Sequence, residues 1–76
     1  MKLKIFETKT HIENFRTVRD EVLVAEFPID KELVYKLGTN EITEEEFEDK
    51  LEDQFHNWCV NHGISVLDGT HWWTYV

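Results

Sequence analysis

The sequence predicts an α+β fold: a small antiparallel β-sheet packed against one long acidic helix and one short helix, with a β-hairpin at the C-terminus. Three features predict it: two extended runs early in the chain, a strongly capped amphipathic segment, and a late Asp-Gly turn signal. With 76 residues, 41% of them hydrophobic and 13% aromatic, the chain can form one domain with a modest core. We therefore treat residues 1–76 as a single domain.

The first two elements are predicted as antiparallel strands. In Lys2–Thr10, Leu3 and Ile5 alternate with lysines, which is the period of a half-buried strand. Val18–Phe27 contains a β-branched run that a proline ends, and the connection between the two segments is too short for a helical crossover. A second interpretation makes residues 12–26 an amphipathic helix, and the sequence leaves both open.

Two helices are predicted next. Asp30 is placed to N-cap a short helix over about residues 31–37, which a glycine ends. A long helix follows over about residues 44–62. Its start carries a capping box, with Thr43 as the N-cap and Glu46 three residues later, and a glycine follows its last turn.

The long helix is amphipathic. At about 100° per residue, one arc is predicted to face the core and contains Phe47, Leu51, Phe55, Trp58, Cys59 and His62. The opposite arc is acidic and contains Glu45, Glu46, Asp49, Glu52 and Asp53. We expect the acidic arc to face solvent.

The end of the chain is predicted to form a hairpin. An Asp-Gly pair separates two extended runs, residues 64–67 and 70–76, and such a pair is typical of a two-residue hairpin turn. The last run has aromatic residues on both faces, with Trp73 and Tyr75 on one and Trp72 on the other. Either the domain itself covers both faces, or Trp72, Trp73 and Tyr75 form a candidate interface for a partner or a homodimer.

The charge of the chain is negative and unevenly placed. The net charge is −8; residues 1–36 hold seven basic and seven acidic groups, whereas residues 37–76 hold nine acids against Lys50 alone. Direct binding to nucleic acid or to an anionic membrane requires positive charge, so both are disfavoured. This distribution favours a cationic partner.

Several features point to the cytoplasm. The N-terminus has no apolar run of signal-peptide length, and no stretch approaches the roughly 20 apolar residues of a membrane span. The single cysteine, Cys59, cannot form an internal disulfide and fits a reducing compartment. We therefore expect a cytoplasmic protein.

The acidic run at residues 41–53 is the strongest candidate for a binding surface. It holds eight acids, and like charges one helical turn apart repel by a few tenths of a kcal/mol per pair. A helix selected for stability alone would interleave lysines. The predicted partner-binding residues are Glu44, Glu45, Glu46, Glu48, Asp49, Glu52 and Asp53. The alternative is a solvated helix face that serves solubility.

Metal binding and catalysis are not predicted. His56, Cys59, His62 and His71 are possible zinc ligands, but their spacing matches no standard site, and positions 56 and 62 differ by about 120° around the helix. No nucleophile has an evident base with an orienting group, and there is no glycine-rich phosphate loop. We expect a protein that is not an enzyme and has no metal or other cofactor.

A short acidic α+β chain with carboxylates along residues 41–53 resembles the DNA-mimic inhibitors encoded by phages. These include an inhibitor of the histone-like protein HU from large lytic Bacillus phages. The resemblance implies a viral protein that acts in the bacterial cytoplasm, where it occupies the DNA-binding surface of a nucleoid protein such as HU, an RNA polymerase or a defence nuclease. It carries over no individual residue role. The alternative function is a protein–protein adaptor that binds or dimerises through the aromatic C-terminal hairpin.

Overall fold

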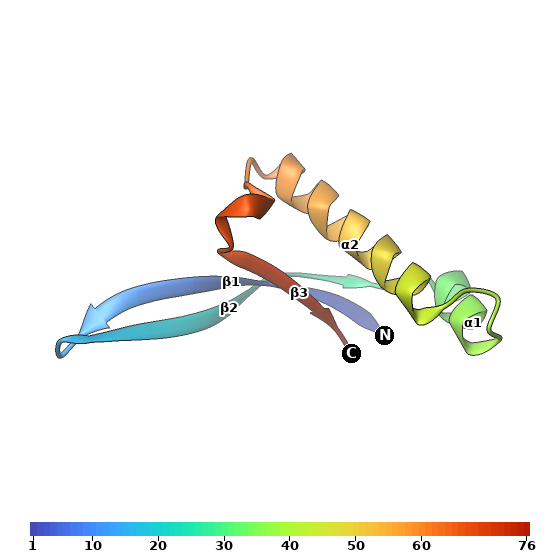
Figure 1. Ribbon diagram of the computed structural model, residues 1–76, viewed down its shortest axis with the longest axis horizontal. Helices are drawn as coiled ribbons and strands as arrows, with labels where there is room; N and C mark the ends of the chain where they lie inside the picture. The colour runs from blue at the N-terminus through green and yellow to red at the C-terminus, as the bar shows by residue number, and fades with distance from the viewer.

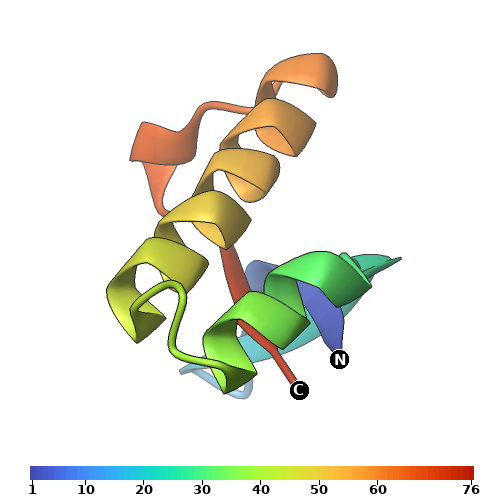
Figure 2. The ribbon, with the colours of Figure 1, turned by 90° about the vertical axis from the view of Figure 1, so that its right-hand side faces the viewer.

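The structure, a computed structural model that describes all 76 residues, is a three-stranded antiparallel sheet with two helices on one side (Figure 1). In chain order the elements are β1 (Lys2–Glu13), β2 (Arg16–Pro28), α1 (Lys31–Gly38), α2 (Glu44–Asn61), the 3₁₀ turn η1 (Val66–Asp68) and β3 (His71–Tyr75). The strand order is β2-β1-β3. Figure 2 shows both helices above the same face of the sheet. The predicted α+β class, antiparallel sheet and pair of helices are confirmed.

The first two strands form one long hairpin, so the helical interpretation of residues 12–26 is wrong. The pairing runs from Lys2 opposite Pro28 to Glu13 opposite Arg16, with one register shift between Ile5 and Phe6. A helix over this segment would lose this long ladder of backbone hydrogen bonds. The predicted strands are confirmed, and each extends beyond its predicted bounds toward the turn.

Both helices begin as predicted. The Asp30 carboxylate accepts a hydrogen bond from the Glu32 N–H at 2.9 Å. The Thr43 hydroxyl oxygen accepts one from the Glu46 N–H at 3.1 Å and donates to the Glu46 carboxylate at 3.3 Å. After the last turn of α2, Gly63 has φ of 68°, a left-handed conformation that a side chain would disfavour.

The predicted C-terminal hairpin is wrong. The segment before the Asp-Gly pair ends in the turn η1, and the last strand pairs with β1, from Leu3 opposite Tyr75 to Glu7 opposite His71. The Ile64 N–H donates to the Cys59 carbonyl at 2.9 Å, which holds this segment against the end of α2. The edge of β1 that faces away from β2 is the place where the last strand pairs instead.

The core lies between the helices and one face of the sheet. Two clusters form it: Leu3, Ile29, Phe47 and Leu51 in one, and Ile5, Phe55 and Cys59 in the other. The predicted inward arc of α2 is therefore right for Phe47, Leu51, Phe55 and Cys59, whereas Trp58 is half-buried. His62 is exposed because it is the C-cap residue, beyond the last turn that rests on the sheet.

The hairpin of β1 and β2 extends beyond the rest of the molecule. The molecule measures 51 Å along its longest axis and 23 and 18 Å along the others, and Figure 1 shows the hairpin projecting past β3 and both helices. We call residues 9–20 the arm. Its turn residues Asn14 and Phe15 have φ of 48° and 64°, and the Phe15 side chain is fully exposed.

Candidate functional site

The outer side of α2 is the first candidate surface. It carries five exposed carboxylates, and we call this set the acidic face: Glu45, Glu46, Asp49, Glu52 and Asp53. These side chains lie opposite the buried residues of the same helix, because α2 rests on the sheet through Phe47, Leu51, Phe55 and Cys59. The prediction that the acidic arc faces solvent is confirmed.

The other two predicted partner-binding residues, Glu44 and Glu48, lie nearer the sheet. The Tyr75 hydroxyl donates a hydrogen bond to Glu48 at 3.4 Å, and Glu48 is half-buried. Burial raises the pKa of Tyr75, and the negative charges of Glu48 and Glu44 raise it further. The structure therefore brings five of the seven residues together on one outward face and directs Glu44 and Glu48 toward the C-terminal strand.

No lysine or arginine forms an ion pair with any carboxylate of α2. The only basic side chain near an α2 carboxylate in an ion-pair geometry is His56, whose Nε2 lies 3.7 Å from Glu52. This contact is an ion pair only when the imidazole is protonated. The ion pairs that lysines form lie within the first half of the chain, Lys2 with Glu26 at 3.0 Å and Lys36 with Glu32 at 3.8 Å. The carboxylates of the acidic face thus form no ion pair with a lysine or an arginine.

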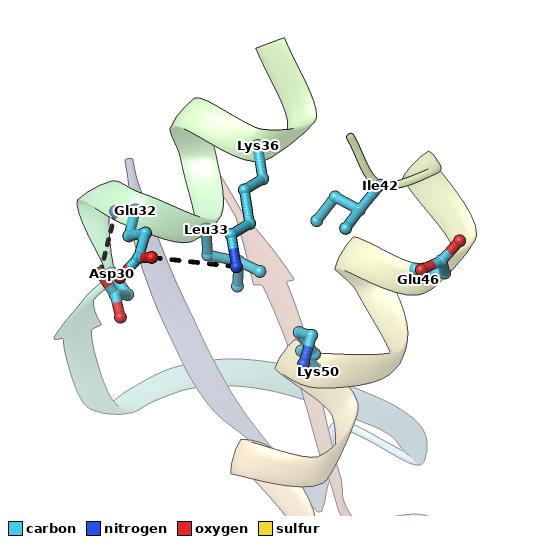
Figure 3. Close-up of a pocket in the computed structure, with 7 residues that line it drawn as sticks. All are labelled: Asp30, Glu32, Leu33, Lys36, Ile42, Glu46 and Lys50. Carbon is cyan, nitrogen blue, oxygen red and sulfur yellow. Dashed lines mark hydrogen bonds and ion pairs between the residues drawn. The ribbon is translucent and has the colours of Figure 1, made fainter. Parts of the chain in front are cut away.

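The one lysine of α2 lies to the side of this face. Lys50 lines a shallow hollow of about 450 Å³ between α1 and α2, shown in Figure 3. The residues around the hollow are Asp30, Glu32, Leu33, Lys36, Ile42, Glu46 and Lys50. Its charges are mixed, Lys36 is paired with Glu32 at 3.8 Å, and no buried polar side-chain atom lacks a partner. The hollow therefore shows no preference for a charged ligand.

The open face of the sheet is the second candidate surface. Phe6 and Trp72, opposite each other on β1 and β3, stack with ring centroids 4.5 Å apart. The Trp72 indole N–H donates to Glu21 at 2.7 Å, and the Thr8 hydroxyl donates to the same oxygen at 2.8 Å. These hydrogen bonds lower the pKa of Glu21. Leu23, opposite Phe6, remains 45% exposed, so an apolar patch with a polar rim is left uncovered.

The structure separates the three aromatic residues that the sequence grouped as an interface. Trp72 belongs to the open face and is 38% exposed. Trp73 packs against the core on the helix side, and Tyr75 meets Phe47 edge to face at 5.4 Å. Within the predicted interface, only Trp72 is therefore presented to a partner.

The histidines and the cysteine near the end of α2 do not form a cluster. Cys59 is buried, and burial, followed by the charge of Asp68, raises the pKa of its thiol. His62 stacks on Trp58 at 4.3 Å, with its Nδ1 2.8 Å from the Trp58 carbonyl oxygen. No group of three or more His, Cys, Asp or Glu side chains is placed to hold a metal ion.

Sequence reasoning missed the arm and the partners of Trp72. Phe6 and Glu21 reach Trp72 only because β3 pairs with β1, and no local pattern encodes that pairing. The arm had a local signal, since an asparagine between two β-branched runs favours the left-handed turn that Asn14 adopts.

Comparison of the chain with known protein families, curated proteins and solved structures finds no match. Neither α1 nor α2 has the length and hydropathy that crossing a membrane requires. The acidic face, the open sheet face and the arm are the candidate binding surfaces of the chain.

Proposed function

We propose that this chain is a non-enzymatic DNA mimic that uses α2 to occupy the DNA-binding surface of a basic protein and thereby inhibits it. The observation that carries the proposal is the row of α2 carboxylates without any lysine or arginine ion pair. Host proteins of the kind that the phage inhibitors bind, such as a nucleoid protein, fit this chemistry.

The charge density of α2 approaches that of duplex DNA. From Glu45 to Asp53 the acidic face holds five carboxylates. At 1.5 Å per residue this segment spans about 12 Å, so one charge of the acidic face occurs per roughly 2.4 Å of axis. Duplex DNA carries one per about 1.7 Å when both strands are counted. A groove lined with lysine and arginine that accepts DNA would find comparable anionic spacing here.

The test is competition with DNA. A labelled duplex is bound to a purified HU-type nucleoid protein, and the chain is titrated in at low salt. We expect the chain to release the duplex, and we expect the triple variant Asp49→Lys, Glu52→Lys, Asp53→Lys to lose this activity. A charge-matched control reverses three exposed carboxylates off the acidic face, Asp20, Glu32 and Glu41.

The control variant should retain most of the competition, because it changes net charge equally but leaves the acidic face intact. If the triple variant and the control variant lost the same share of their competition with DNA, net charge alone would explain the binding, and this result would count against a mimic. If HU is not bound, immobilised parent and triple variant are compared for the basic proteins that each retains from bacterial lysate. Identical retention by the two would contradict the proposal.

The open sheet face supports a second candidate, a protein–protein adaptor. The Phe6–Trp72 stack and the exposed Leu23 form the apolar centre that such an interface uses. Binding through this patch would depend on Trp72 and would change little with salt, whereas binding through the acidic face weakens steeply as salt screens the charges. Affinity measured at two ionic strengths, with Trp72→Ala as the variant, separates the two functions.

A further inference from the structure

The arm is the part of the sheet that depends least on the rest of the chain. Neither helix reaches it in Figure 1, and its Ile12 side chain is 80% exposed. Its turn is strained, because Phe15 adopts φ of 64°, a conformation that bulky side chains disfavour. A two-stranded ribbon without further support is marginally stable in water. The few side-chain contacts between its strands therefore have a large effect on whether the arm is ordered.

His11 lies between two carboxylates of the arm. Its Nδ1 is 3.3 Å from a carboxylate oxygen of Asp20, on β2. Its Nε2 is 3.4 Å from a carboxylate oxygen of Glu13, on β1. The contact with Asp20 joins the two strands, and the contact with Glu13 lies along β1 next to the turn. Each ring nitrogen of His11 therefore faces an anion.

This arrangement suits the protonated form of His11 better than the neutral form. The imidazolium ring carries a hydrogen on each nitrogen and can donate to both carboxylates. The neutral ring carries only one hydrogen, so its other nitrogen would direct a lone pair at a carboxylate oxygen. A proton added to His11 therefore supplies a second hydrogen bond and turns both contacts into ion pairs.

The other charged side chains near His11 leave its two contacts in place. The strand register puts Lys9 opposite Asp20, and it puts Arg16 opposite Glu13. Neither Lys9 nor Arg16 forms an ion pair with these carboxylates. Figure 1 shows the arm beyond β3 and both helices, so β1 and β2 alone supply charged neighbours to His11. His11 is thus the ion-pairing neighbour of both carboxylates.

We infer that His11 is a pH-sensitive switch of the arm, in which the protonated imidazole holds β1 to β2 through Asp20, with Glu13 as a second anion. Imidazoles ordinarily change charge between about pH 5 and 8, a range in which carboxylates remain largely ionised. The closed arm places the added proton between two anions, whereas the open arm leaves it in water, so acidification favours the closed arm. As pH rises through this range, the proton and its stabilisation are lost. The switch does not depend on what α2 binds.

The test measures protection of the arm amides against hydrogen exchange by NMR, at about pH 5.5 and about pH 7.5. Protection factors are compared, because they remove the direct effect of pH on the exchange reaction. The amides of His11 and Val18 are the probes: these residues are paired, and the odd-numbered residues of β1 direct their backbone groups toward β2. Exposed ion pairs each contribute little, so we expect protection about threefold to tenfold higher at the lower pH.

Matched variants separate His11 from the other groups that titrate. His11→Gln should abolish the pH dependence of arm protection. The double variant Glu13→Gln, Asp20→Asn should also abolish it while keeping the histidine. His56→Gln is the control, because His56 has a similar side-chain exposure, 46% against 48% for His11, and also contacts a carboxylate, but it lies on α2. The control should leave the response of the arm unchanged.

Salt provides a measurement on the parent chain itself. At about 1 M salt the Debye length falls to about 3 Å, so the response to pH should shrink to less than about twofold. This measurement decides the matter if the variants lose their arm structure at both pH values. The inference is overturned by equal protection of the parent arm at the two pH values, or by a response that persists at high salt. A response that survives in His11→Gln or in the double variant, or that disappears in His56→Gln, overturns it as well.

Discussion

Asp49 is the residue at which repulsion along α2 is greatest, and its replacement by asparagine should stabilise the protein. Four carboxylates lie three or four residues from it on the same helix: Glu45, Glu46, Glu52 and Asp53. Like charges at these spacings cost about 0.2–0.5 kcal/mol per pair at low salt. Asp49→Asn removes four such pairs at nearly unchanged helix propensity, so we expect a gain of about 1 kcal/mol.

The gain is measured by urea denaturation at low salt and again at about 1 M salt, where the Debye length falls to about 3 Å. A gain of 1 kcal/mol corresponds to a rise in Tm of about 4–8 °C for a domain of this size. Asp20→Asn is the control, since Asp20 lies on the arm and outside α2. An Asp49→Asn variant that is no more stable than the parent at low salt, or whose gain survives high salt, would refute the idea that these charges are uncompensated.

Three further predictions concern the core, the arm and the open face. Leu51→Ala should cost about 2–5 kcal/mol in urea denaturation, because Leu51 is 1% exposed in the main core cluster; a loss below 1 kcal/mol would contradict that packing. Phe15→Gly should stabilise the arm by about 0.5–1 kcal/mol, since φ of 64° strains a phenylalanine, and slower exchange of cross-strand arm amides checks it. Hydrogen bonds from Trp72 and Thr8 lower the pKa of Glu21 in the folded state. The ionised carboxylate therefore stabilises the fold above its ordinary pKa near 4.5, and this contribution is lost as pH falls through the lower folded-state pKa. The stability advantage of the parent over Glu21→Gln should therefore shrink from neutral to acidic pH, and a constant difference would contradict the Trp72 and Thr8 hydrogen bonds.

Elements with local determinants could be predicted closely. The start of α2 follows from Thr43 and Glu46, and its buried side follows from apolar residues at helical spacing. Of the residues predicted to face the core, only His62 is exposed. The prediction applied helical spacing to His62, but this residue is the C-cap and lies beyond the last helical residue. The acidic face could likewise be predicted, since the core stripe of a helix determines where its remaining side chains point.

The strand with which the C-terminal segment pairs could not be predicted from local sequence patterns. Its Asp-Gly pair predicts a hairpin, and Gly69 does adopt a left-handed conformation with φ of 72°. The Asp68 carboxylate instead accepts hydrogen bonds from the Thr70 N–H and hydroxyl, at 2.9 and 2.8 Å, and the turn leads the chain to β1. A turn signal specifies a local reversal, whereas the strand that pairs afterwards depends on which edge is free.

The sequence by itself determined the caps and buried stripe of α2, the extended character of β1 and β2, and the concentration of negative charge in the second half of the chain. These follow from backbone propensities, capping hydrogen bonds and periodicity, which act over a few residues. Only the tertiary structure decided that β3 joins β1, that the helices cover the face of Trp73 and leave that of Trp72 open, and that the arm is left with a free edge. Those outcomes depend on contacts between residues far apart in the chain, and the competition among free edges and apolar faces is resolved only when the whole domain packs.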